Sequence, residues 1–169
     1  FETQAESIRA QGARQVSIGR WRPGEAQRPD RLHCAVRVPW IIADIGLPLQ
    51  KGSRWHVRHV RSLSSSLPAI EINLSDIVVT YSGGDSIQVR IPDGLLGCPI
   101  YQTSRAAANA IRHFFFDLAP SNEVVRNVLD TRLFYPDRLF PVIGSTDPET
   151  GRRVVGTDAE SFLENPDES

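Results

Sequence analysis

Basic side chains recur at alternate positions in two short stretches of this chain, residues 31–38 and 54–60. If each stretch is a β-strand, its alternate residues share one face of the sheet. Guanidinium groups in a row suit phosphate, because each presents paired N–H donors. The pattern predicts an anion-binding face, which Arg90 of a later strand can join, consisting of Arg31, His33, Arg37, Arg54, His56 and Arg58. A solvated face, neutralised by acidic residues of the same chain such as Glu71 and Asp93, is the alternative.

The sequence predicts no catalytic residues, no metal site and no cofactor. On a strand, His56 and His59 point to opposite faces, and a histidine base also needs an orienting group and an acid. The Cys and His spacings of zinc sites, the acidic calcium loop, the phosphate-binding loop and the Gly-x-Ser-x-Gly motif are all missing from the sequence.

The charge of the chain is divided between its two parts. Residues 1–63 contain eleven basic and five acidic residues, and residues 64–169 contain eight basic and fifteen acidic residues, so charges of +6 and −7 make up the net −1. This division favours an anionic partner for the first part, either nucleic acid or an acidic protein surface, or else contact between neighbouring copies.

Three aromatic residues are candidates for contact with a protein partner. Phe116 falls outside the apolar stripe of its expected helix, and Trp21 and Trp40 flank proline-containing loops. Exposed aromatic side chains are typical of interfaces. A second layer of core under a loop explains the three residues equally well.

Strands are expected before helices along this chain. Residues 31–38, 54–60, 69–81 and 86–91 alternate, residues 104–118 and 121–133 have helical apolar stripes, and residues 138–143 and 152–157 flank a turn. This order predicts a single α+β domain. We expect a mostly antiparallel sheet of five to seven strands, with two consecutive helices packed on one face.

The apolar pattern of residues 69–91 predicts the register of a hairpin. The apolar positions change parity at Ser75–Asp76, which requires a bulge or a break. Burial of the apolar side chains favours pairing of Tyr81 with Ile87 and of Val79 with Val89, so the loop between the strands has an odd number of residues.

The limits of the domain follow from composition. We expect a basic arm or short strand over residues 1–30, the α+β core over 31–157, with 40–49 as an apolar connector, and a disordered acidic tail over 158–169. No stretch has the length and apolar character of a membrane span or a signal peptide. Cys34 lies on the apolar side of its strand, which predicts a buried free thiol and favours a reducing intracellular compartment.

These features favour a non-catalytic interaction or structural module, a subunit of a larger assembly that has protein partners or self-associates. Its Arg-rich face would meet nucleic acid or an acidic protein surface. The alternative is a small phosphodiesterase or nuclease, in which His33 or His56 is the base and Arg37, Arg54 or Arg58 clamps phosphate.

Overall fold

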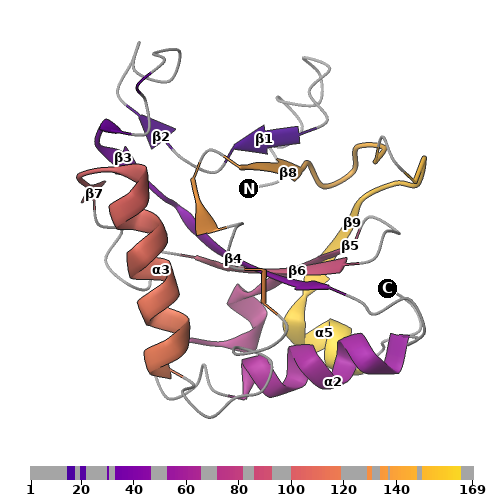
Figure 1. Cartoon of the computed structure of the whole chain (residues 1–169). Coiled ribbons are helices and arrows are strands. Elements are labelled where there is room, and N and C mark those ends of the chain that lie inside the picture. Colours follow the sequence, from indigo (N-terminus) through magenta and orange to yellow (C-terminus); the bar gives the residue numbers. More distant parts are fainter. Residues whose placement is uncertain are drawn as a thin grey trace.

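The computed structural model describes residues 15–17, 20–21, 30, 33–46, 53–65, 72–81, 86–92, 100–118, 129–130, 134–136, 138–147 and 150–164 (Figure 1). Within these ranges the chain has an α+β fold in which every strand pair is antiparallel, as the sequence predicts. None of the described helices is long and apolar enough to cross a membrane.

A four-stranded sheet forms the centre of the molecule. Its strands are β4 (Trp40–Gly46), β6 (Ser86–Pro92), β5 (Val78–Tyr81) and β9 (Val155–Asp158), in the order β4-β6-β5-β9. Isoleucine, valine and alanine occupy alternate positions of the three strands β4, β6 and β5, so one face of the sheet is apolar. The buried residues of this apolar face are Ile41, Ala43, Ile45, Val79, Ile87, Val89 and Ile91.

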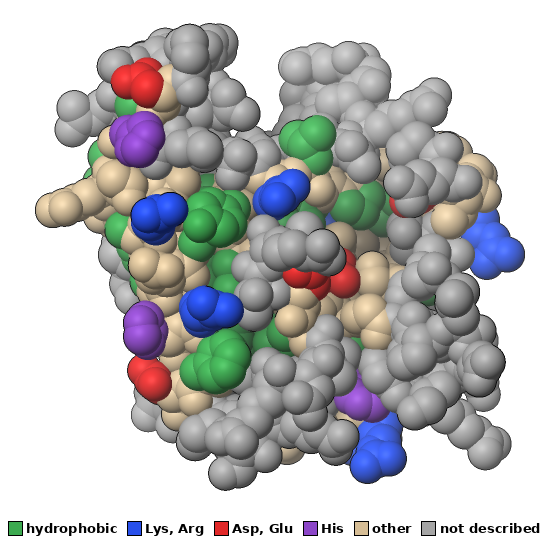
Figure 2. All heavy atoms as spheres, viewed as in Figure 1, with side chains coloured by type: hydrophobic (Ala, Val, Ile, Leu, Met, Phe, Trp, Pro, Cys, Tyr) green, Lys and Arg blue, Asp and Glu red, His purple; other side chains and the backbone are tan. Residues whose placement is uncertain are grey.

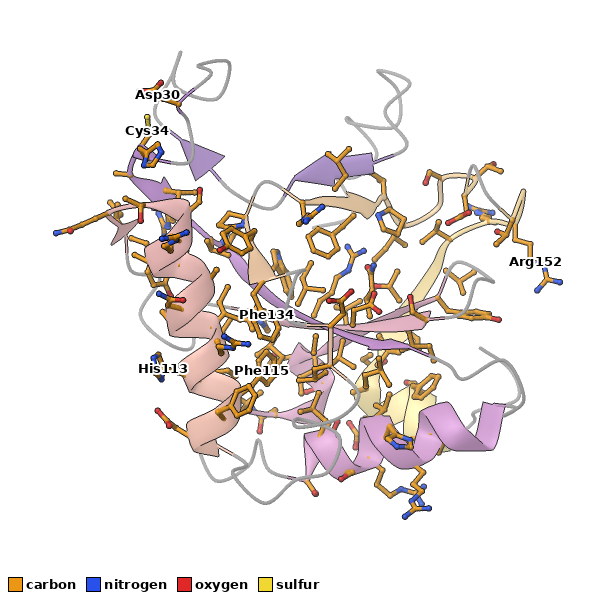
Figure 3. The ribbon with its side chains drawn as sticks, viewed as in Figure 1. Asp30, Cys34, His113, Phe115, Phe134 and Arg152 are labelled. Atoms are coloured by element: carbon orange, nitrogen blue, oxygen red, sulfur yellow. The ribbon has the colours of Figure 1, made fainter. Side chains whose placement is uncertain are left out.

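Three helices contribute to the core on the apolar face: α2 (Ser53–Ser64), α3 (Ser104–Leu118) and α5 (Ala159–Glu164) (Figure 1). The α3 helix has the bounds that its apolar spacing predicts. Its Phe115 is fully buried and stacks on Phe134 with ring centroids 5.5 Å apart (Figure 3).

Two smaller sheets complete the described part. The strand β1 (Gln15–Ser17) pairs with β8 (Leu139–Pro141). The strands β2 (Arg20–Trp21), β3 (Val36–Arg37) and β7 (Ile100–Tyr101) form a second small sheet in that order. The nine described strands are therefore divided among three sheets and do not form one sheet of five to seven strands.

The predicted hairpin register is confirmed. Val79 pairs with Val89, and Tyr81 pairs with Ile87. The break expected at Ser75–Asp76 is the 3-10 turn η3 (Leu74–Asp76), which lies immediately before β5.

Four expectations about local structure are wrong. Residues 53–64 are a helix and not a strand, because Val57, Val60 and Leu63 recur every third residue and turn toward the core. The expected connector of residues 40–49 contains β4. Leu129, expected in a helix, forms a β-bridge with Ile45, and the rest of that expected helix lies largely outside the described residues.

The fourth difference concerns the pairing of the last strands and the tail. The two sides of the turn at 147–151 bridge at Thr146 and Arg153, but β8 pairs with β1 and β9 pairs with β5. In the expected acidic tail, residues 159–164 form α5. Asp158 caps this helix by accepting hydrogen bonds from the backbone N–H of Ser161 at 2.8 Å and from its hydroxyl at 2.7 Å, and Phe162 is buried in the core.

Candidate functional site

The side of the central sheet that faces away from the apolar core carries polar side chains. The register places Asp44 opposite Gln88 on β6, and Thr80 of β5 lies opposite Gln88 on the other side. Ser86 and Arg90 share this side because they are two residues from Gln88 along the same strand. We call this surface the polar face; it consists of Asp44, Thr80, Ser86, Gln88 and Arg90.

Asp44 is a carboxylate placed within an apolar strand. Its side chain is only 7% exposed, and its Oδ2 accepts hydrogen bonds from the Ser86 hydroxyl at 3.2 Å and the Gln88 amide at 3.4 Å. Burial raises the pKa of Asp44 to about 6, the two hydrogen bonds oppose this change, and the charge of Asp130 adds to it. A carboxyl group with such a pKa exchanges its proton close to neutral pH, which is typical of functional sites.

Asp130 is brought to Asp44 by the backbone. Its N–H donates to the carbonyl oxygen of Asp44 at 3.3 Å, and the preceding residue, Leu129, bridges with Ile45. The segment at 129–130 therefore lies along the outer edge of β4, next to Asp44. The negative charge of Asp130 adds to the effect of burial and raises the pKa of Asp44 further.

Gln88 links Asp44 to a buried cation. The guanidinium Nη2 of Arg90 donates to Gln88 Oε1 at 3.0 Å and to the carbonyl oxygen of Pro141 at 2.9 Å. The first bond fixes the orientation of the amide, so that its NH2 group is the one that faces Asp44. Arg90 also ties β8 to the central sheet through Pro141.

Arg90 is an unusual residue for a sheet interior. It is 6% exposed, and burial lowers its pKa to about 10. Its two hydrogen bonds in the described part of the chain go to uncharged oxygens, and its Nε and the Thr80 hydroxyl are buried without a hydrogen-bond partner there. Leaving a buried polar atom without a partner is costly, so these two atoms call for an explanation.

The donor set around Asp44 fits a magnesium ion better than zinc. In the described residues no three His, Cys, Asp or Glu side chains gather to hold a metal, whereas a magnesium ion needs only one or two carboxylates when substrate phosphates and water supply its other ligands. Two hydrogen bonds occupy about half of the acceptor capacity of the Asp44 carboxylate, which leaves room for a cation. Asp44 and Asp130 are the residues that would hold it.

The structure does not place the predicted anion-binding residues in one sheet. Arg37 lies in β3 of a small sheet, His33 lies in a turn before it, and Arg58 lies on α2. Arg54 and His56 are also in α2, although only their backbone is described, and Arg31 lies outside the described residues. The expectation of a single row fails because residues 54–60 are helical.

The aromatic candidates have different surroundings. Phe116 is half-buried against the core, and the guanidinium carbon of Arg112 lies 5.9 Å from its ring centroid. Trp40 is half-buried at the start of β4, whereas only the backbone of Trp21 is described. Cys34, expected to be buried, is a half-buried free thiol with its Sγ 3.9 Å from the carbonyl oxygen of Asp30, and Cys98 lies outside the described residues.

Sequence reasoning missed Asp44 and Asp130. A signal for Asp44 was present, because a single carboxylate interrupts the apolar run Trp40–Gly46, and burying an unpaired carboxylate has a large free-energy cost. Asp130 had no comparable signal, since the expected helix of residues 121–133 made it a surface residue.

Comparisons with known proteins bear on the fold. No protein-family model matches this chain, and no curated protein matches its sequence. The polymerase domain of ligase D from Mycobacterium tuberculosis, solved in complex with DNA, superposes on 90% of this chain with a TM-score of 0.58 and 13% identity. The chain spans 54% of that polymerase domain. The AEP domain of the cyanophage S-2L primase-polymerase aligns with a TM-score of 0.47 and 15% identity, over 94% of this chain and 69% of that one.

The shared fold corrects the function expected from the sequence. The expectation of a non-catalytic interaction module, a subunit of a larger assembly, is wrong, because the fold is shared with the DNA-bound polymerase domain of an enzyme. The alternative, a small phosphodiesterase or nuclease, agrees better with this fold. The structure does not bring together the histidines and arginines first assigned to that alternative.

Proposed function

We propose that this chain is a domain of an enzyme that transfers phosphoryl or nucleotidyl groups on nucleic acid, with its reacting centre at Asp44 and Asp130. The observation that carries the proposal is the pair itself: Asp44 has a buried carboxylate with a pKa near 6, and its backbone carbonyl accepts a hydrogen bond from the backbone N–H of a second acidic residue, Asp130. The fold shared with a DNA-bound polymerase domain supports nucleic acid as the substrate class.

The two carboxylates suit this chemistry because phosphoryl transfer depends on positioning and charge stabilisation. A divalent cation, when bound, would neutralise charge on the phosphate oxygens. Asp44 and Asp130 would hold that cation beside β4, and the Ser86 hydroxyl and Gln88 amide would keep the Asp44 carboxylate in one orientation.

Arg90 is a positioning residue in this proposal. Its Nη2 atom fixes the Gln88 amide, and its bond to Pro141 holds β8 over the polar face. Arg90 therefore acts on Asp44 through Gln88, and its own buried position does not require it to touch the substrate.

The test uses the full chain with a labelled primer–template DNA, nucleoside triphosphates and either Mg²⁺ or Mn²⁺, and it measures both extended and shortened strands. We expect activity in the parent and a loss of about 100-fold or more in Asp44→Asn and in Asp130→Asn. Asp117→Asn, which removes one exposed carboxylate from α3, is the matched control and should keep full activity. A parent without either activity, or an Asp44→Asn variant as active as the control, would contradict the proposal.

A further inference from the structure

The outer side of α3 carries a basic stripe that the proposed reacting centre does not use. Arg105, Asn109 and Arg112 are spaced by four and three residues, so they lie on one side of the helix, and all three are exposed. Phe116 continues the stripe by one turn, and Arg112 lies over its ring. Phe116 is half-buried against the core, so this end of the stripe is anchored to the core.

Strands β3 and β7 extend this stripe beyond the start of α3. Arg37 is exposed, and it pairs with Ile100, which is 72% exposed and the most exposed large apolar side chain of the described residues. On its other side Arg37 pairs with Arg20. We call Arg37, Ile100, Arg105, Asn109 and Arg112 the basic edge.

The α3 part of the basic edge has few acidic residues near it in the sequence. Between residues 100 and 117 the sequence contains two arginines and one histidine, and its only acidic residue is Asp117 at the end of the helix. Figure 2 shows Arg and His side chains following one another down the side of the molecule where β3 and α3 lie, with an acidic side chain at each end of the row. Figure 3 places His113 on this side and Arg152 at the opposite side of the molecule.

We propose that the basic edge binds the sugar-phosphate backbone of a nucleic-acid strand, and this inference rests on the proposed function. The seven-residue separation of Arg105 and Arg112 corresponds to a rise of about 10 Å along the helix, so the two guanidinium groups can contact different phosphates of one strand. Arg37 adds a third contact beyond the helix start. Ile100 provides an apolar surface for a sugar or base between the cations.

The experiment measures binding of a fluorescein-labelled 12-nucleotide single-stranded DNA by anisotropy at several salt concentrations. Arg105→Gln with Arg112→Gln should raise the Kd about tenfold and lower the log–log salt slope by about 1.4, since each lost contact on a single strand accounts for about 0.7. Arg152→Gln with Arg153→Gln removes the same charge from two exposed arginines elsewhere, and it should change the Kd less than twofold. Circular dichroism checks that both variants are folded.

Three results would overturn the inference: a parent that does not bind the DNA, equal losses in the two double variants, or displacement of the DNA by polyglutamate at the same charge concentration. The last result would assign the basic edge to an acidic protein surface. The proposed function fails separately. If Arg105→Gln with Arg112→Gln keeps the parent affinity while Asp44→Asn abolishes the reaction, the basic edge is rejected and the proposed function stands. If the double variant loses affinity while Asp44→Asn is as active as the parent, the reacting centre is rejected and the basic edge stands.

Discussion

The backbone N–H of Asp130 donates to the carbonyl oxygen of Asp44, with 3.3 Å between the two atoms. This bond joins residues 86 positions apart in the sequence and sets two carboxylates at the edge of the central sheet. Two carboxylates held together resist simultaneous ionisation, which contributes to the raised pKa of Asp44. A divalent cation would relieve both the repulsion and the cost of burying the charge.

The first prediction concerns stability and pH. Because the pKa of Asp44 rises from 3.8 to about 6 on folding, the folded state binds its proton more tightly than the unfolded state. The resulting stability is fully present below about pH 4 and is lost as the pH rises through 6, which corresponds to about 3 kcal/mol. Urea denaturation in a metal chelator from pH 4 to 7.5 should show this loss in the parent. An equal pH-dependent loss of stability in Asp44→Asn would show that other groups cause it.

The second prediction concerns divalent cations. A cation at Asp44 and Asp130 favours their charged forms, so Mg²⁺ should raise the thermal midpoint of the parent at pH 7.5 and raise it less at pH 5. Asp44→Asn should show no Mg²⁺-dependent increase, whereas Asp117→Asn should respond like the parent. An equal response of all three proteins would indicate that Mg²⁺ acts elsewhere.

The third prediction concerns Gln88. Its amide donates to Asp44 Oδ2 and lowers the pKa of that carboxyl group, so Gln88→Ala should move the Asp44 pKa above 6. Carbon-detected NMR of the Asp44 carboxyl group across a pH titration measures this change directly. Gln102→Ala, at an exposed glutamine before α3, is the control. An unchanged or lower pKa in Gln88→Ala would mean that the bond does not hold in solution.

The fourth prediction tests the packing of α3. Phe115 is fully buried, stacks on Phe134 and contacts Phe114 edge-on at 5.1 Å, so Phe115→Ala should lower the free energy of unfolding by about 3–5 kcal/mol. The adjacent Phe116 is only half-buried, and Phe116→Ala should cost clearly less. Urea denaturation compares the two variants. Equal losses would show that the apolar stripe of α3 is assigned to the wrong side.

The elements that the sequence predicts well are those whose signal is local. The α3 helix and the β5–β6 register follow from apolar spacing, because a wrong register would expose Val79 and Ile87. The strand expected at 54–60 is wrong because its apolar spacing fits both a strand and a helix. Its seven residues alternate with a period of two. A helix over 53–64, however, buries both Val60 and the later Leu63 in the core.

The candidate site was harder to predict because it depends on contacts between distant segments. Asp44 meets Gln88 through pairing of β4 with β6, and Asp130 joins them through a single bridge after a long segment of chain. Neither contact leaves a periodic pattern in the sequence. The basic residues, in contrast, were conspicuous in the sequence, but the fold distributes them over β3 and α2.

The most direct measurement of the central claim is a double-mutant cycle of the DNA reaction with Asp44→Asn, Asp130→Asn and the variant that carries both changes. If the two carboxylates form one centre, each single change removes most of the activity and the double change adds little, because residues that act as a unit are not additive. We predict a double variant within about threefold of the slower single variant. Losses that multiply, or single variants that retain the parent rate, would contradict a shared reacting centre at Asp44 and Asp130.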